Sequence, residues 1–222
     1  MTEQKTQALH AIYERERARL SVLAASDAPQ GEYASPVFGE GDPNAPVLLI
    51  GEAPGAEETK LSRPFVGKAG KQLDELIRLS SLGRDRLYIT NVVKYRPVVR
   101  SARSIRNRTP DKAEIIASLP LLKMEIALLS PMVIVTLGNT PLKAIWLLTG
   151  QKPVVIGDVH GAPRHIAIEG RGHTLFAMYH PASGIYNRSL VPVMRQDAVS
   201  LGEHLVKWIE SAQIPSDLCY TE

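Results

Sequence analysis

Residues 47–58 read VLLIGEAPGAEE, an apolar run followed by a turn that contains two glycines and a proline. The run VLLIG is short and apolar throughout, which is typical of a strand buried on both faces of a parallel sheet. Glu52 follows the first glycine directly, so a carboxylate is expected at the open, carboxyl end of that strand. This acid is either solvated in a tight turn or placed to act as a base or to hold a water molecule.

Three more apolar runs predict strands of the same kind: LYITNVV (87–93), MVIVTLG (132–138) and TLFAMYH (174–180). Helical periodicity follows or separates them at about 68–80, 111–129, 139–148 and 194–211. The alternation predicts an α/β fold with three layers, α/β/α, around a central, mainly parallel four-stranded sheet. A weaker strand or hairpin is expected in VVIGDVHGAPRHIAIEG, a peripheral helix at about 4–25, and a loop in DAPQGEYASP.

Length and composition indicate one soluble globular domain over 1–222, with an N-terminal helix and loop to residue 36 and a core over 37–212. No apolar run is long enough to cross a bilayer, and the polar N-terminus lacks a signal sequence, so a cytoplasmic protein is expected. The single cysteine, Cys219, leaves disulfides and thiolate clusters without ligands. The net charge of +3 is compatible with a polyanionic partner but does not establish one.

Ligands of open α/β sheets lie beyond the carboxyl ends of the strands, and polar residues follow the predicted strands here. Asn91 either caps backbone or reads a ring edge that carries one donor and one acceptor. His180 is either structural or catalytic, and Phe65, in a glycine-bounded loop, is either core or a surface on which a flat ring stacks. GEAPG matches neither a Walker loop nor a dinucleotide fingerprint, and the histidines show no metal-binding spacing, so no metal is predicted.

The segment KYRPVVRSARSIRNR (94–108) contains six basic residues and no acid: Lys94, Arg96, Arg100, Arg103, Arg106 and Arg108. A solvated basic loop is the plain interpretation. Because the segment follows the second predicted strand, it belongs to the same edge of the sheet as Glu52, where it could neutralise nucleic-acid phosphates. The position of the segment favours contact with nucleic-acid phosphates over a merely solvated loop.

With these motifs in this order, the chain resembles the family-four uracil-DNA glycosylases. The similarity runs over most of residues 37–197, through VFGEGDPNAPVLLIGEAPGAEE, RPFVGKAGKQLDELI, YITNVVKYRP, NRTP, VIVTLGN and YHPAS. The resemblance implies an enzyme that turns uracil out of single- or double-stranded DNA and hydrolyses its N-glycosidic bond, leaving an abasic site. It also implies a monomer that needs no cofactor for this reaction.

The resemblance assigns roles to particular residues. Glu52 would orient or activate the attacking water, with the backbone of Gly51 and Ala53 around the base, while Asn91 would bind the O4 and N3 edge of uracil and Phe65 would stack on it. His180 would contact O2, and Glu58 would crowd C5 and so exclude thymine. A DNA-contacting segment would follow: Ser183, Gly184, Ile185, Tyr186, Asn187 and Arg188, with Ile185 or Tyr186 filling the space that the nucleotide leaves.

The chain departs from typical members of the family at the iron-sulfur cluster, which is bound there by four cysteines. Tyr95 stands at one cysteine position, Ser118 at another, and the N-terminal stretch has none. Because thiolates are the ligands of such a cluster, its absence is expected. Our hypothesis is that apolar packing around Tyr95 and the N-terminal helix takes over its structural role.

Two other functions stay open at this point. The chain could be a non-catalytic protein that binds DNA or DNA damage on the same fold, although binding alone does not require Glu52, Asn91 and His180 together. It could also be a glycosylase for other deaminated bases, or for a nucleoside. The basic segment favours a polymeric substrate.

Overall fold

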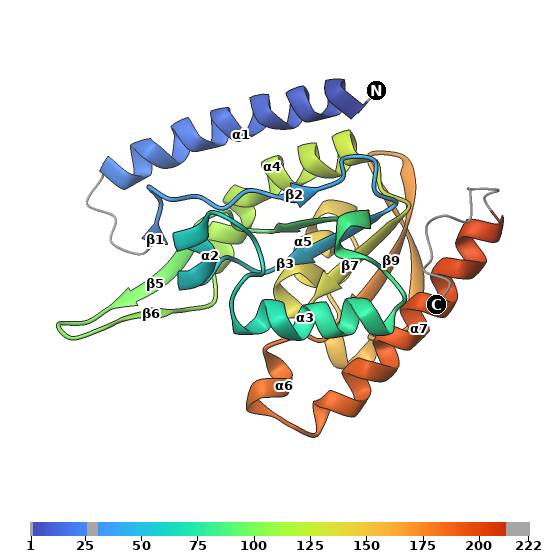
Figure 1. Cartoon of the computed structure of the whole chain (residues 1–222). Coiled ribbons are helices and arrows are strands. Elements are labelled where there is room, and N and C mark those ends of the chain that lie inside the picture. The colour runs from blue at the N-terminus through green and yellow to red at the C-terminus, as the bar shows by residue number, and fades with distance from the viewer. Residues whose placement is uncertain (1, 26–30, 212–222) are drawn as a thin grey trace.

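A six-stranded sheet lies at the centre of the computed structural model, which describes residues 2–25 and 31–211 (Figure 1). Its strand order is β2 (Glu40–Gly41), β4 (Leu87–Asn91), β3 (Val47–Gly51), β7 (Val133–Leu137), β9 (Arg171–Met178) and β8 (Pro163–Ile168). Strands β4, β3, β7 and β9 are parallel, and the two edge strands are antiparallel to their neighbours. The predicted parallel core of four strands is confirmed, and two antiparallel edge strands extend it.

Helices cover both faces of the sheet, as the α/β/α prediction requires (Figure 1). Helices α1 (Thr2–Ala25), α4 (Lys112–Leu129) and α5 (Asn139–Thr149) lie on one face, and α3 (Lys68–Leu79) and α7 (Leu190–Ser211) on the other. Strand β3 buries Leu48 and Ile50 on the first face and Val47 and Leu49 on the second, which explains why its sequence is apolar throughout. None of the described helices is both long and apolar enough to cross a membrane.

Two short helices, α2 (Ala56–Leu61) and α6 (Ser183–Tyr186), lie at the carboxyl edge of the sheet and border the site. Of two 3-10 turns, η1 (Arg84–Arg86) directly precedes β4, and η2 (Ile156–Asp158) lies between α5 and β8. Helix α2 begins two residues after Pro54, so the GEAPG turn leads from β3 directly into a helix. None of these elements has the apolar periodicity from which longer helices are predicted.

The basic segment forms a β-hairpin, so the prediction of a loop there is wrong. Strands β5 (Arg96–Arg100) and β6 (Ile105–Asn107) pair antiparallel, and β1 (Gly31–Glu32) adds a third strand to β5. The hairpin projects from the body of the molecule (Figure 1). Its arginines hide the strand signal, since Pro97 and Val98 are buried while Val99 and Ile105 are exposed.

Lys94 lies in the core and not at the surface. Its side chain is 1% exposed, and Nζ donates to Glu125 Oε2 at 2.6 Å, to Thr90 Oγ1 at 2.7 Å and to the Asn91 carbonyl at 2.5 Å. Tyr13 of α1 donates to the other Glu125 oxygen at 2.7 Å. The prediction that Lys94 contacts DNA is therefore wrong, because a buried ion pair occupies its charge. This ion pair also ties the end of β4 to α4.

Replacing Lys94 by Met leaves the Glu125 carboxylate buried without its counter-ion. We expect this to lower the free energy of unfolding by about 3–5 kcal/mol, measured by urea denaturation. Adding Glu125→Gln should recover most of that loss. Lys123→Met, which removes an exposed lysine from α4, the helix of Glu125, should lower the free energy of unfolding by less than about 1 kcal/mol. Equal losses of stability in Lys94→Met and Lys123→Met would contradict a buried ion pair between Lys94 and Glu125.

Candidate active site

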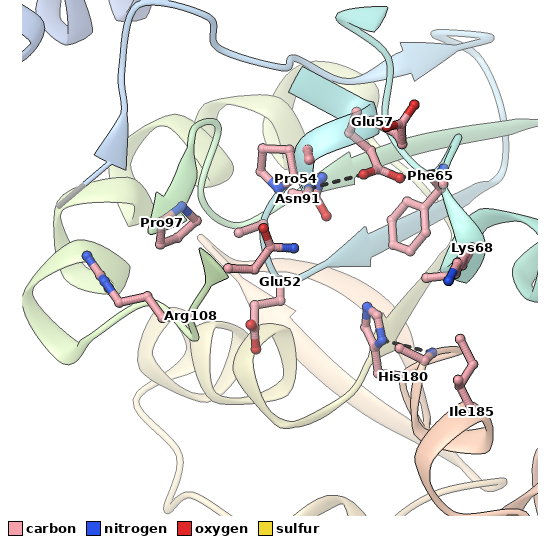
Figure 2. A pocket seen from close by; sticks show the side chains of 18 of the residues that line it. Glu52, Pro54, Glu57, Phe65, Lys68, Asn91, Pro97, Arg108, His180 and Ile185 are labelled. Carbon is pink, nitrogen blue, oxygen red and sulfur yellow. Dashed lines mark hydrogen bonds between the residues drawn. The ribbon is translucent and has the colours of Figure 1, made fainter. Parts of the chain in front are cut away.

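A cavity of about 540 Å³ opens at the carboxyl ends of β3 and β4 (Figure 2). It is lined by the GEAPG turn and α2, the Phe65 loop, the base of the β5–β6 hairpin, and the segment from His180 into α6. Figure 2 shows Phe65, Lys68, His180 and Ile185 on one side of Glu52, and Pro97 and Arg108 on the other. The predicted pocket residues Ala53, Glu58 and Asn91 also line it.

Gly51 lies beneath the side chains of Phe65 and Asn91. A Cβ atom at this position would lie 2.4 Å from Phe65 Cζ and 2.3 Å from Asn91 Oδ1, closer than real Cβ atoms approach other groups. The aromatic ring and the amide therefore meet directly over the backbone at the end of β3. A glycine is required here because the space above it is already filled.

The amide oxygen of Asn91 is buried without a hydrogen-bond partner in the described part of the chain. The residue is 2% exposed and ends β4, with its backbone carbonyl held by Lys94. A buried acceptor without a donor costs about 1–3 kcal/mol. A ligand or a water molecule that brings an N–H or O–H into the pocket would satisfy this acceptor.

His180 presents a neutral imidazole to the pocket. Its Nδ1 accepts a hydrogen bond from Ala182 N at 3.1 Å, drawn as the dashed line at His180 in Figure 2. Burial lowers the pKa of His180 to about 4, against a smaller opposing effect of Glu58. Because Nδ1 is the acceptor, the ring proton resides on Nε2, which can donate to a ligand at neutral pH.

Glu52 is half-buried and is held by a hydroxyl of helix α5. Thr140 Oγ1 donates to Glu52 Oε2 at 2.5 Å. Burial raises the pKa of Glu52, and hydrogen bonds from Thr140 and Thr109 reduce that rise. A carboxylate with a raised pKa is a better base than a solvated one, and its charge acts strongly in a partly desolvated cavity. The sequence predicts the strand MVIVTLG just before Thr140 and a helix from residue 139, but it does not single out Thr140.

Glu58 binds three backbone N–H groups with its carboxylate. Oε1 accepts from Val66 N at 3.1 Å and from Gly67 N at 2.7 Å, and Oε2 accepts from Gly55 N at 3.1 Å. The side chain thus joins the GEAPG turn to the loop of Phe65. Both oxygens are engaged, so the carboxylate is a fixed part of the pocket wall.

The predicted DNA-contacting arginines fall into two groups. Arg108 lines the pocket and pairs with Glu114, at 2.5 and 2.8 Å, while Arg96 pairs with Glu32 at 3.2 Å. Arg100, Arg103 and Arg106 are exposed on the hairpin, and none forms an ion pair with another described residue. The second group keeps its charge available for a partner.

Helix α6 places two apolar side chains at the mouth of the cavity. Ile185 is 42% exposed and Tyr186 is 89% exposed, and both line the cavity. Gly184 is buried against α7, and Ser183, Asn187 and Arg188 complete the predicted segment on the surface around it. Large apolar groups exposed beside a pocket indicate a contact surface.

Comparison with known proteins places this pocket in a family. The model of the uracil DNA glycosylase superfamily matches residues 38–210, which include the whole cavity. The chain belongs to the uracil-DNA glycosylase superfamily.

Relatives named type-4 uracil-DNA glycosylase cover most of the chain. The one from Sulfurisphaera tokodaii is 39% identical over 75% of this chain and 73% of its own. The one from Pyrobaculum aerophilum is 36% identical over 80% and 87% of the two chains, and the one from Thermotoga maritima is 41% identical over 69% and 73%. The resemblance inferred from the motifs is confirmed.

Tyr95 and Ser118, which the family resemblance places at cysteine positions, form hydrogen bonds with Glu114 in the structure. Tyr95 donates its phenolic hydrogen to Glu114 Oε1 at 2.9 Å and packs on Tyr33 with 4.4 Å between ring centroids. Ser118 Oγ donates to the Glu114 carbonyl at 2.8 Å. A phenol and a hydroxyl do not fit the thiolate ligation of an iron-sulfur cluster. The packing around Tyr95 is polar as well as apolar, and Cys219 lies outside the described residues.

Thr140→Val removes the hydroxyl that stabilises ionised Glu52, so we expect the pKa of Glu52 to rise further. Carbon NMR titration of the labelled carboxyl group would measure it in wild type and variant. Thr149→Val, at the far end of the same helix, is the control and should leave the titration unchanged. A pKa that stays the same or falls in Thr140→Val would contradict the assignment.

Proposed function

We propose that this protein is a DNA-repair enzyme that turns deoxyuridine out of DNA and hydrolyses its N-glycosidic bond, leaving free uracil and an abasic site. The observation that carries the proposal is the buried amide oxygen of Asn91, which has no hydrogen-bond partner among the described residues and lies near the Phe65 ring in a pocket that Glu52 also lines. Family membership and the names of the relatives support the same activity.

The pocket has the groups that recognise a uracil ring. The N3–H of uracil donates to Asn91 Oδ1, and the amide nitrogen donates to O4, so both ring groups are satisfied. Phe65 stacks on the ring, and the backbone of Gly51 and Ala53 encloses its edge. Glu58, fixed by three N–H groups, stands at C5 and excludes the methyl group of thymine.

Bond cleavage separates charge, and the pocket has a group for each sign. The C1′–N1 bond breaks with its electron pair on the base, where the N–H at His180 Nε2 stabilises the negative charge on O2. The sugar becomes cation-like, and the Glu52 carboxylate stabilises it and orients the water whose oxygen bonds to C1′. The water proton is accepted by Glu52 or leaves with solvent, and uracil departs as the anion or after protonation.

DNA would lie across the carboxyl edge of the sheet, between the hairpin and α6. Arg96, Arg100, Arg103, Arg106 and Arg108 would contact the backbone phosphates. Ile185 or Tyr186 would fill the space left by the extruded nucleotide, with Ser183, Gly184, Asn187 and Arg188 following the strand. The substrate is single- or double-stranded DNA.

We further propose a cytoplasmic monomer that works without metal or cluster. Within residues 2–25 and 31–211 there is no group of three or more histidine, cysteine, aspartate or glutamate side chains placed to hold a metal ion. The hydroxyl groups at Tyr95 and Ser118 support a cluster-free protein, because they already bond to Glu114. Stoichiometric iron and sulfide in the purified protein would contradict this.

The activity is tested by release of uracil from a uracil-containing oligonucleotide, single- and double-stranded. We expect Glu52→Ala and His180→Ala each to lower single-turnover cleavage by about 10²–10³-fold. Asn91→Ala should lower cleavage similarly, while His165→Ala, an exposed histidine on β8, should leave it unchanged. Tight binding without cleavage by wild type would instead favour a damage-binding protein, and cleavage only of other deaminated bases would favour the alternative substrate range.

The hairpin register divides its arginines between two faces. Directly paired residues share a face, so Arg100 and Ile105 lie on the same side as Val98 and Asn107, while Arg106, paired with Val99, lies on the opposite face. Pro97, Asn107 and Arg108 line the cavity, so both faces of the hairpin contribute to it at its base.

Arg100→Ala and Arg106→Ala should each weaken DNA binding and reduce the slope of log K against log salt by about 1. Lys123→Ala, which removes an exposed lysine of α4, is the control and should leave both quantities unchanged. Binding to a labelled oligonucleotide over a salt series measures them. Unchanged binding and slope in both hairpin variants would contradict the hairpin as a DNA-binding surface.

A further inference from the structure

Phe65 has a backbone conformation that an aromatic residue rarely adopts. Its φ is +53°, in the left-handed region that disfavours side chains with a Cβ atom. The residue is buried, and its ring lies over Gly51 on the pocket wall. Such strain persists only where surrounding contacts hold it, and it gathers at functional sites.

Arg84 holds the carbonyl groups on both sides of Phe65. Its NH2 group donates to the Pro64 carbonyl at 2.8 Å and to the Phe65 carbonyl at 3.1 Å. One guanidinium nitrogen thus fixes the two peptide groups whose rotation defines φ and ψ of Phe65. Arg84 belongs to η1 and does not line the cavity, so its effect on the pocket passes through this loop.

Glu58 holds the other end of the same peptide group. The carbonyl of Phe65 and the N–H of Val66 belong to one peptide plane, and Glu58 Oε1 accepts from that N–H at 3.1 Å. The plane is therefore bound by a guanidinium on its oxygen side and by a carboxylate on its nitrogen side. Hydrogen bonds to charged groups are stronger than those between neutral groups, so the plane has little freedom to rotate.

Arg84 is itself anchored to two other elements. Its NH1 group donates to Asp74 of α3 at 2.6 Å, and NH2 lies 3.9 Å from Glu40 of β2. The Phe65 backbone also packs directly on α3, where a Cβ atom at Gly70 would lie 1.9 Å from the Phe65 oxygen. The loop is thus fixed relative to α3 and to the edge of the sheet.

We propose that Arg84 and Glu58 are positioning residues that together hold Phe65 in its left-handed conformation, so that its ring is preformed as the stacking surface for the extruded base. This rests on the proposed function for the identity of the base. Stacking on a surface that is already in place avoids the ordering of a loop at the moment of binding. The strain at Phe65 is maintained for that purpose.

Arg63 offers a matched control for Arg84. It also pairs with Glu40, at 2.8 and 3.0 Å, and it lies in the same loop as Phe65. Among the described residues, the guanidinium that binds the Pro64 and Phe65 carbonyls is that of Arg84 and not that of Arg63. Arg63→Ala therefore removes an equal charge and the Glu40 contact while leaving the clamp on Phe65 intact.

The test is a double-mutant cycle on single-turnover uracil release, with Arg84→Ala, Phe65→Ala and the double variant. We expect Arg84→Ala to lower cleavage roughly tenfold or more, Arg84→Lys to recover part of it, and Arg63→Ala to change it less than about twofold. In the Phe65→Ala background, Arg84→Ala should have little further effect, because its action passes through the ring. Losses that multiply fully in the double variant would overturn the proposal.

Hydrogen exchange separates failure of this proposal from failure of the proposed function. The amides of Val66 and Gly67 should exchange faster in Arg84→Ala than in wild type or Arg63→Ala, whether or not the protein cleaves DNA. Unchanged exchange in Arg84→Ala would overturn the clamp even with an active wild type. An inactive wild type with the expected exchange pattern would overturn the glycosylase assignment and leave the clamp standing.

Discussion

At the end of a buried strand lies an amide oxygen that has no hydrogen-bond partner among the described residues, and the pocket is arranged around it. Asn91 ends β4 with its side chain over Gly51, where no Cβ atom could fit, and Phe65 closes the space beside it. An apolar residue in that place would be more stable in the free protein, since a buried acceptor without a donor costs about 1–3 kcal/mol. Under the proposed function, the extruded base supplies the missing donor, which explains why a polar residue stands at this place.

Charged side chains hold the backbone around Asn91 in place by hydrogen bonds and ion pairs. Lys94 pairs with Glu125 in the core and donates to the Asn91 carbonyl, and so holds the carboxyl end of β4 in place. Glu58 and Arg84 bind backbone groups of the loops above. Charge therefore serves two purposes here: buried or half-buried charges shape the pocket, while the exposed arginines of the hairpin remain available for phosphates.

The parallel strands and the main helices could be predicted from sequence because a strand buried on both faces is apolar throughout and the helices are periodic. Glu52, Asn91 and His180 could be found because each lies at or just beyond the carboxyl end of such a strand. Thr140 could not, since its role depends on contact with Glu52, 88 positions away. Lys94 was misplaced for the same reason, because Glu125 lies 31 positions away.

The hairpin and the conformation of the Phe65 loop escaped prediction for a related reason. Arginines that alternate with valine and isoleucine look like a solvated segment, and only the pairing of β5 with β6 and β1 reveals strands. A left-handed φ at an aromatic residue has no sequence signal, because it is imposed by distant charged partners. Local pattern thus predicts the elements, while contacts between distant residues decide how the pocket is held.

The most direct test of the account is a crystal structure of the Glu52→Gln variant bound to a uracil-containing oligonucleotide. The account predicts an extruded uracil stacked on Phe65, with N3 within hydrogen-bonding distance of Asn91 Oδ1 and O2 within hydrogen-bonding distance of His180 Nε2. A uracil bound outside this pocket, with Asn91 Oδ1 bonded to a donor of the protein, would contradict it.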